Sequence, residues 1–217
     1  RLNAFTINGF PFDNFHVDQV KQRVYLPTWA DTARLEYTQR LARILTALLP
    51  EGDSIGSIST LPIGWHDNPF ATRKIDMEQA GRNLREMATF LETHEKASGR
   101  RIVIAIEPEP GCVLDTIDDM VRFFERELAD ESHRRYITAC HDICHSAVMN
   151  ESQREVIRRY ANAGIMIGKV QVSSAIVADW NAIGESNFDN AIEQLGDFAE
   201  DRYLHQTGLV KRDGTFR

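Results

Sequence analysis

Short apolar runs alternate with longer segments of helical periodicity along this chain. The clearest run is Ile102 to Glu107 (IVIAIE), where apolar residues follow one another without polar alternation, as a strand buried on both faces requires. Weaker runs of the same kind predict further strands at residues 2–8, 54–61, 136–142, 165–173 and 202–206. Because strands and helices take turns, the pattern favours an α/β fold with a parallel sheet and crossover helices.

Between these runs, apolar residues recur every three or four positions, which predicts helices. A last helix is expected through residues 191–198. The ends of the others coincide with residues that commonly cap helices. They are Asp31 or Thr32 and Leu49 for the first helix, Asp76 and Gly99 for the second, Asp115 or Thr116 for the start of the third, and Asn150 and Gly164 for the fourth.

The repeat of strand and helix, about six βα units, predicts a (β/α)8 TIM barrel. Eight such units usually take about 250 residues. We therefore expect the 217 residues to form a single barrel domain, residues 1–217, that is incomplete and lacks strands at both ends. A dinucleotide-binding fold is disfavoured, because no Gly-x-Gly-x-x-Gly follows a predicted strand. The open sheet edges of such a piece invite association, so an oligomer is possible.

The segment from Gly9 to Trp29 is long for a loop and is rich in aromatic residues. Two interpretations remain open. The segment forms a lid over a small polar ligand, or it folds into a hydrophobic cluster of its own. The residues on which both interpretations depend are Phe10, Phe12, Phe15, His16, Tyr25, Leu26 and Trp29.

Composition narrows the classes of partner. A net charge of -7 and a pI near 5.5 predict weak attraction to polyphosphate, so we expect a small-molecule substrate and no nucleic acid. The three cysteines cannot form a disulfide framework, which favours a reducing compartment, the cytoplasm. Neither a membrane span nor a signal peptide is predicted, since the chain has no long apolar run and no charged-then-apolar leader.

Groups that bind metals or move protons stand at the ends of two neighbouring predicted strands. Glu107 ends one of them, and Asp142 and His145 (CHDICH) end the next. In barrel enzymes the chemistry lies at this rim. Side chains alternate along a strand, so Asp142 is expected to face the barrel mouth and His141 the helices. Two carboxylates and an imidazole are costly to desolvate without a cation, which predicts a divalent ion.

An oxygen-rich ligand set favours manganese, magnesium or cobalt, with zinc possible. An alternative is that Glu107 merely caps a turn or pairs with an arginine. The spacing of Cys140 and Cys144 with two histidines suggests zinc, but alternation places Cys140 inside a strand, where a packed small hydrophobe is the better interpretation.

The strand at 165–173 carries polar residues on one face, among them Lys169, Gln171 and Ser173. Polar groups inside a barrel must be satisfied or used. Gln171 can offer its amide oxygen to a metal or hold the bound water, and Lys169 can act as an electrophile or acid. Equally, Lys169 can form a salt bridge with a buried acid. Candidates for substrate contacts at strand ends and in loops are Asn8, His16, Trp65, Glu109 and His205.

The order Glu107 (IEPEPGC), Asp142 and His145 (HDICH), then a polar Gln171 resembles the xylose isomerase-like TIM barrels, which include sugar isomerases, epimerases and endonuclease IV. The chain also resembles the EboE-type metabolite traffic proteins of a bacterial secondary-metabolite gene cluster. That resemblance rests on the motifs TINGFPF, VYLPTW, GSISTLPIGW, AIEPEPGC, HDICHSAVM and IGKVQVSSA.

The resemblance implies a metal held by a glutamate, an Asp-x-x-His motif, a histidine of the next strand and a late glutamate. Glu107, Asp142 and His145 match, Gln171 stands in place of the histidine, and the late acid would lie beyond Arg217. The implied function is isomerisation or epimerisation of a sugar-like precursor, with Glu107 moving a proton. The alternatives are a non-catalytic metabolite-binding protein and a metal-dependent nuclease, which the acidic charge disfavours.

Overall fold

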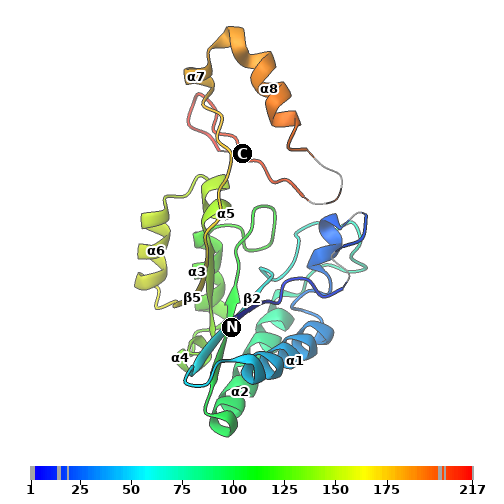
Figure 1. Cartoon of the computed structure of the whole chain (residues 1–217), viewed down its shortest axis with the longest axis vertical. Helices are drawn as coiled ribbons and strands as arrows, with labels where there is room; N and C mark the ends of the chain where they lie inside the picture. Colours follow the sequence, from blue (N-terminus) through cyan, green and yellow to red (C-terminus); the bar gives the residue numbers. More distant parts are fainter. Residues whose placement is uncertain (1–2, 14–15, 19, 200–201, 203, 217) are drawn as a thin grey trace.

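Five parallel strands form one sheet in the order β1-β2-β3-β4-β5, in a computed structural model of the chain (Figure 1). The structure describes residues 3–13, 16–18, 20–199, 202 and 204–216. Each strand pairs with its successor in the chain, which is the arrangement that consecutive βα units produce. The strands are β1 (Thr6–Asn8), β2 (Ile55–Thr60), β3 (Arg101–Ile106), β4 (Ile137–Asp142) and β5 (Ile167–Gln171).

Helices connect the strands. In Figure 1, α1, α2, α3 and α6 follow one another around the outside of the sheet, whereas α7 and α8 stand apart at the top. The helical elements are η1 (Lys21–Tyr25), α1 (Thr32–Leu48), α2 (Met77–Ser98), α3 (Ile117–Glu127), α4 (Glu131–Arg134), α5 (Ile143–Val148), α6 (Gln153–Asn162), α7 (Trp180–Ile183), η2 (Glu185–Asn187) and α8 (Phe188–Gly196).

The sheet is curved like part of a barrel. Lys169 of β5 donates hydrogen bonds to Ser59 Oγ of β2 at 3.0 Å and to the Ile7 carbonyl of β1 at 3.5 Å, although these strands lie at opposite ends of the strand order. A flat sheet would hold them several strand spacings of about 4.8 Å apart. The architecture is therefore an α/β fold with a five-stranded parallel half-barrel, consistent with an incomplete TIM barrel.

The strand predictions are confirmed for β1 to β5 to within a few residues, but the predicted sixth strand at 202–206 is wrong. Residues 202 and 204–206 adopt no regular structure, and Tyr203 lies outside the described residues. The Arg202 carbonyl accepts hydrogen bonds from the backbone N–H groups of Val20 and Lys21, but no ladder of such bonds continues along the described residues of this segment, and a strand needs one to satisfy its backbone groups. Helix α5, which starts directly after β4, was not predicted.

The predicted N-cap residues are confirmed at α1 (Asp31), α2 and α3, and the prediction is wrong at α6. The Asp76 side chain accepts a hydrogen bond from the Gln79 backbone at the start of α2, and Thr116 forms a capping box at the start of α3. At α6 the cap is Ser152, not Asn150 as predicted. Asn150 instead adopts a positive φ of 56° in the preceding turn, which asparagine tolerates better than most residues.

The aromatic segment between β1 and α1 packs into the core. Tyr25 and Trp29 are buried, and Trp29 Nε1 donates a hydrogen bond to Thr60 Oγ1 at 3.1 Å. Arg34 of α1 holds the segment by donating to the carbonyls of Gly9, Phe10 and Pro27. Tyr25 and Trp29 thus belong to the main core, while Phe10, Val24 and Tyr25 also line the cavity described below, so both interpretations stay open; Phe15 lies outside the described part.

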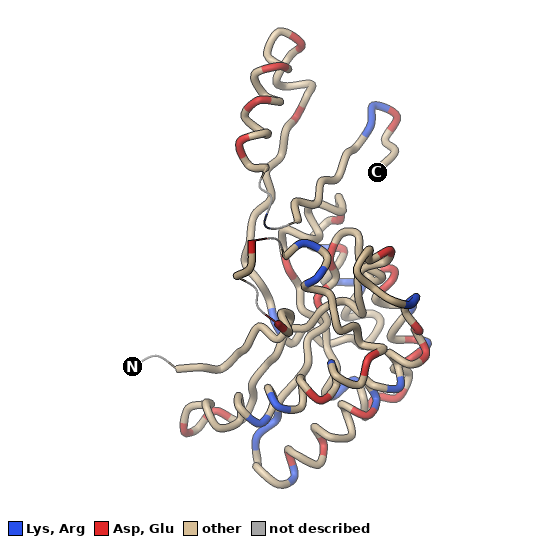
Figure 2. Tube along the Cα trace, turned by 90° about the vertical axis from the view of Figure 1, so that its right-hand side faces the viewer, with Lys and Arg blue, Asp and Glu red and all other residues tan. Residues whose placement is uncertain are grey.

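Surface charges are mixed over the helical body (Figure 2). The stretch that holds α7 and α8, residues 172–199, carries acidic residues and no lysine or arginine. Such a surface offers no basic track for a phosphate backbone. Within the described residues, no helix combines the length and apolar character needed to cross a bilayer.

Candidate active site

Three strand ends bring two carboxylates and an amide together. Glu107 follows β3 directly, Asp142 ends β4 and Gln171 ends β5, where it is the register partner of Asp142. Gln171 Nε2 donates to Glu107 Oε1 at 2.7 Å and to Asp142 Oδ2 at 2.8 Å. The sequence placed these residues at one rim, and the structure has them in direct contact.

Asp142 is both a rim carboxylate and the N-cap of α5. Its Oδ1 accepts hydrogen bonds from the backbone N–H of Cys144 at 2.9 Å, from that of His145 at 3.4 Å and from Ser173 Oγ at 2.5 Å. Burial opposes ionisation, but the bond from Ser173 and the nearby His145 hold the pKa of Asp142 below its usual range. The cap starts a helical turn at once after β4, which brings His145 beside the carboxylate.

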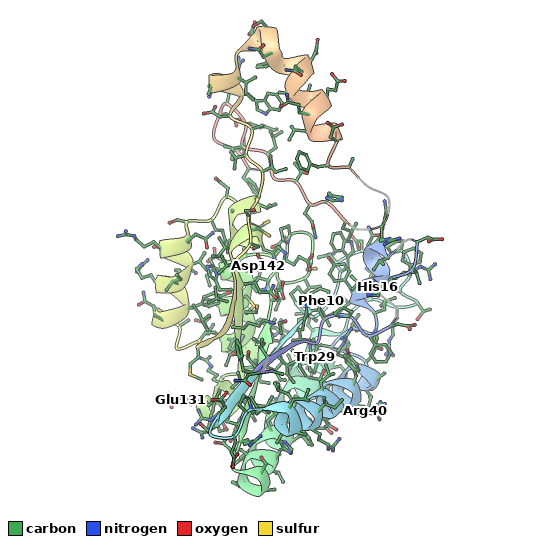
Figure 3. All side chains as sticks on the ribbon, viewed as in Figure 1. Phe10, His16, Trp29, Arg40, Glu131 and Asp142 are labelled. Carbon is green, nitrogen blue, oxygen red and sulfur yellow. The ribbon has the colours of Figure 1, made fainter. Side chains whose placement is uncertain are left out.

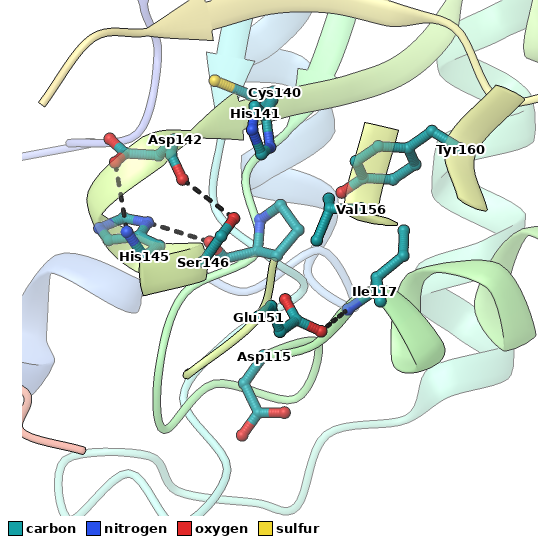
Figure 4. Close-up of a pocket in the computed structure, with 11 residues that line it drawn as sticks. Asp115, Ile117, Cys140, His141, Asp142, His145, Ser146, Glu151, Val156 and Tyr160 are labelled. Atoms are coloured by element: carbon teal, nitrogen blue, oxygen red, sulfur yellow. Dashed lines mark hydrogen bonds between the residues drawn. The ribbon is translucent and has the colours of Figure 1, made fainter. Parts of the chain in front are cut away.

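His145 is oriented by a backbone carbonyl (Figure 4). Its Nδ1 lies 2.9 Å from the Pro108 oxygen and 3.7 Å from Glu107 Oε1. A carbonyl oxygen can only accept, so Nδ1 carries the proton in this bond, which leaves Nε2 as the ring atom able to bind a metal. Metal-binding histidines are commonly held in this way.

Glu107 is the most unusual acid of the site. Its side chain is 5% exposed, Oε1 accepts from Gln171, and Oε2 is buried without a hydrogen-bond partner among the described residues. Burial raises the pKa of Glu107 to about 7, with Glu109 and Asp142 adding to the rise and His145 opposing it. An unpaired buried carboxylate oxygen is costly, and a cation or a ligand hydroxyl would satisfy it.

A cavity of about 240 Å³ opens beside these groups, in the central part of the molecule where Figure 3 labels Phe10, one of the lining residues. Glu109 gives the cavity a second carboxylate. Its Oε1 accepts from the Tyr25 hydroxyl and from Gln206 Nε2, each at 2.8 Å, and burial raises its pKa. The residues that line the cavity are Asn8, Phe10, Pro11, Val20, Lys21, Val24, Tyr25, Glu107, Glu109, His145 and Leu204.

The lining suits a small polar molecule with hydroxyl groups. Of the predicted substrate contacts, Asn8 and Glu109 line the cavity, while His16, Trp65 and His205 do not. Trp65 packs against Tyr25, a lining residue of the cavity, with the two ring centroids 5.0 Å apart. His16 and His205 are exposed. Substrate binding by any of these residues stays a prediction.

Lys169 lies deeper in the half-barrel than the carboxylates. It precedes Gln171 by two positions on β5 and bonds to Ser59 and the Ile7 carbonyl. Within the described part of the chain it forms no salt bridge with an acid and does not line the cavity. Its ammonium group is therefore engaged with neutral oxygens across the concave face, and a catalytic role for it stays a prediction.

Alternation along β4 is as expected. His141 faces the helices, where its ring meets that of Tyr160 of α6 edge-on at 6.5 Å, and Cys140 is fully buried. Figure 4 shows these residues around a small internal cavity of about 10 Å³. A cavity of that size is at the lower limit for one water molecule. Cys140 is thus a packed core residue, which confirms the interpretation from the sequence.

Gln206 at the site was not predicted, while Tyr25 and Cys144 were named only within a candidate lid segment and a disfavoured zinc motif. Tyr25 and Gln206 come from segments far from the strand ends, and only the fold brings them to Glu109. Cys144 had a local signal, since it follows the cap residue Asp142 by two positions in the first turn of α5. One ligand atom from each of Asp142, Cys144 and His145 lies within 4.8 Å of the others.

Fold and site together define an α/β half-barrel with a carboxylate-rich site at the carboxyl ends of its strands. No family model matches the chain. A curated relative, 7-methyl-GTP pyrophosphatase from Idiomarina loihiensis, is 32% identical over 101 residues, which cover 40% of this chain and 50% of that protein. The chain thus spans about half the length of this relative.

Solved structures with a similar arrangement include the 3-keto-D-glucoside 4-epimerase YcjR from E. coli, at a TM-score of 0.45 and 14% identity over 84% of this chain and 66% of that one. The IOLI protein with a bound zinc atom gives a TM-score of 0.41 and 13% identity over 95% and 66%. SacUVDE gives 0.34 and 8% over 94% and 91%. At these identities and scores, the chemistry follows from this chain's own residues alone.

Proposed function

We propose that this chain carries the site of a divalent-metal-dependent isomerase or epimerase for a sugar-like or hydroxy-carbonyl compound. The observation that carries the proposal is the buried, unpaired Oε2 of Glu107 beside Asp142 and His145, at the edge of a cavity with polar lining. The donor set fits a cation, because two buried carboxylates and a partly buried imidazole gather at neighbouring strand ends.

Glu107, Asp142 and His145 are the residues proposed to hold the ion. Gln171 is proposed as a fourth ligand, which requires its amide to turn, because its nitrogen now faces the carboxylates. A bound divalent ion would supply polarisation of the substrate carbonyl and stabilise negative charge on its oxygen. The resemblance to EboE-type proteins suggests a secondary-metabolite precursor as the substrate, and the free cysteines agree with a cytoplasmic location.

Glu107 is the proposed proton carrier. A pKa near 7 suits a group that takes a proton from the carbon next to a carbonyl and returns it to the neighbouring carbon, which isomerises the substrate; epimerisation at one carbon would need a second donor on the opposite face. The carboxyl group holds the proton only until it returns it to the substrate, so each cycle restores the enzyme. Asn8 and Glu109 are proposed to form hydrogen bonds with substrate hydroxyls. Lys169, deeper in the half-barrel, is proposed to stabilise the negative charge of the enediolate by the charge of its ammonium group.

The test measures proton exchange and metal content separately. The purified protein is analysed for bound metal, and aldoses, ketoses and keto-sugars are incubated with it in D2O while NMR follows deuterium uptake next to the carbonyl. We expect uptake that stops with chelator and falls at least about 100-fold in Glu107→Gln. Glu155→Gln, on the exposed face of α6, serves as the control. Uptake that ignores both chelator and Glu107→Gln would refute the proposal.

A specific observation favours a second candidate, a non-catalytic metabolite-binding protein. The Gln171 amide already bridges Glu107 and Asp142, and two N–H donors can stabilise two carboxylates without an ion. In that case the cavity holds its ligand unchanged. Calorimetry that detects ligand binding in the presence of chelator, with no deuterium uptake by the same ligand, would favour this candidate over the enzyme.

A further inference from the structure

Cys144 shares one small volume with two proposed ligands. One ligand atom from each of Asp142, Cys144 and His145 lies within 4.8 Å of the others. The reason is local, because the Asp142 cap accepts from the backbone of both other residues and so folds them around its carboxylate. Cys144 is half-buried, whereas Cys112 and Cys140 are buried.

An independent observation also points to a cation at this cluster. Glu107, 5% exposed, places Oε1 at 3.7 Å from His145 Nδ1, and its Oε2 has no hydrogen-bond partner among the described residues. Through the Gln171 amide, Glu107 is also one hydrogen-bonded link from Asp142. Buried negative charge of this kind is stabilised by a nearby positive ion.

The orientation of Gln171 decides where such an ion fits. With its nitrogen donating to both Glu107 and Asp142, the amide occupies the place that an ion shared by these two carboxylates would need. An ion that uses a remaining lone pair of Asp142 together with His145 leaves both amide hydrogen bonds intact. The thiol of Cys144 is the third ligand group, within 4.8 Å of ligand atoms of both Asp142 and His145.

We propose that Cys144 is a ligand of the divalent ion, together with Asp142 and His145, and that its sulfur makes the site select zinc over magnesium and manganese. Thiolates favour zinc and cobalt, whereas magnesium and manganese prefer oxygen. On binding, the thiol proton leaves to solvent and the sulfur takes the ion. The inference rests on the proposed function and revises its ligand set: Cys144 takes the place of Glu107 and Gln171 as a ligand, and Glu107 acts only as the proton carrier.

Cobalt(II) provides a direct spectroscopic test. Thiolate ligation of cobalt gives an intense near-ultraviolet charge-transfer band, which oxygen and nitrogen ligands do not give. We expect the band when cobalt is added to the full chain, its loss in Cys144→Ser, and its retention in Cys112→Ala as the matched control. Zinc affinity should fall by at least about 100-fold in Cys144→Ser, since even the loss of an outer partner costs up to that much. Bound cobalt without the band would overturn the inference.

A second measurement needs no variant. The protein is alkylated with iodoacetamide with and without zinc, and the modified cysteine peptides are quantified by mass spectrometry. We expect zinc to protect Cys144 at least tenfold, while the buried Cys112 and Cys140 react slowly in both samples. Equal alkylation of Cys144 while zinc is bound would contradict the inference even if Cys144→Ser failed to fold.

The two proposals fail in different ways. Metal-dependent deuterium uptake without a thiolate band would leave the enzyme standing and remove Cys144 from the ligand set. A thiolate band and zinc protection, with no uptake from any substrate, would keep the ligand assignment and remove the isomerase.

Discussion

The Nε2 atom of Gln171 lies 2.7 Å from Oε1 of Glu107. The same nitrogen lies 2.8 Å from Oδ2 of Asp142, so one amide group neutralises part of two carboxylates at once. Hydrogen bonds to charged groups are stronger than neutral ones, and here they do part of the work of a cation. The relationship makes Gln171 the residue whose replacement tests the electrostatics of the site most directly.

Gln171→Glu should make the protein dependent on metal for stability. The change removes two donors and adds a third carboxylate, so we expect the free energy of unfolding in chelator to fall by about 3 kcal/mol. Zinc at about 100 times its dissociation constant should restore about 2.7 kcal/mol. Urea unfolding with and without zinc measures both values. Gln194→Glu on the exposed face of α8 is the control, and an equal loss there would count against this account.

Arg34 should be a stability determinant of the aromatic segment. The residue is fully buried and donates to the carbonyls of Gly9, Phe10 and Pro27. Arg34→Lys keeps the charge but cannot reach all three carbonyls, so we expect a loss of about 3 kcal/mol in the free energy of unfolding. Arg40→Lys, on the exposed face of the same helix, should change it by less than about 0.5 kcal/mol. Chemical denaturation of both variants measures how much the Arg34 hydrogen bonds contribute to the free energy of unfolding.

Gly168 should tolerate no side chain. A Cβ there would lie 2.2 Å from Thr138 Oγ1 and 3.1 Å from Val103 Cγ2, on the side where β5 packs against β4 and β3. We expect Gly168→Ala to destabilise the protein by about 1–3 kcal/mol through overpacking. Gly196→Ala in α8 meets no atom within 4 Å and should be neutral or slightly stabilising. If thermal unfolding shows no difference between the two variants, β5 does not pack as described.

Asp115 gives a pH dependence with a definite sign. Burial, together with a hydrogen bond and the charge of Asp119, raises the pKa of Asp115 from 3.8 to about 6. The folded protein therefore binds this proton more tightly than the unfolded chain does, so the contribution to stability is present below about pH 4 and is lost as the pH rises through about 6.

Asp115→Asn cannot ionise and can donate to Asp119, so it should be more stable than the parent at pH 7–8, with the advantage disappearing near pH 4. Denaturation at several pH values checks this. Asp67→Asn is the control. The Asp67 side chain is 95% exposed, so this change should alter the free energy of unfolding little at every pH tested. A pH-independent effect of Asp115→Asn would show that ionisation is not involved.

Much of the frame follows from local sequence. Buried parallel strands need unbroken apolar runs, and Ile102 to Glu107 is such a run, so β3 and the position of Glu107 at its end were predictable. Alternation along β4 likewise separated Asp142 from His141. The predicted sixth strand failed because the short and mostly polar segment 202–206 (RYLHQ) does not specify a pairing partner.

The amino-acid sequence by itself determined which residues end the strands, because strand periodicity is a local property of the backbone. Only the tertiary structure decided their partners. The register of β4 and β5 sets Gln171 opposite Asp142, the curvature of the sheet brings Lys169 to Ser59 of β2, and the packing of the chain brings Tyr25 and Gln206 to Glu109. Register, curvature and packing are set by contacts between segments distant in the chain, and no local pattern encodes them.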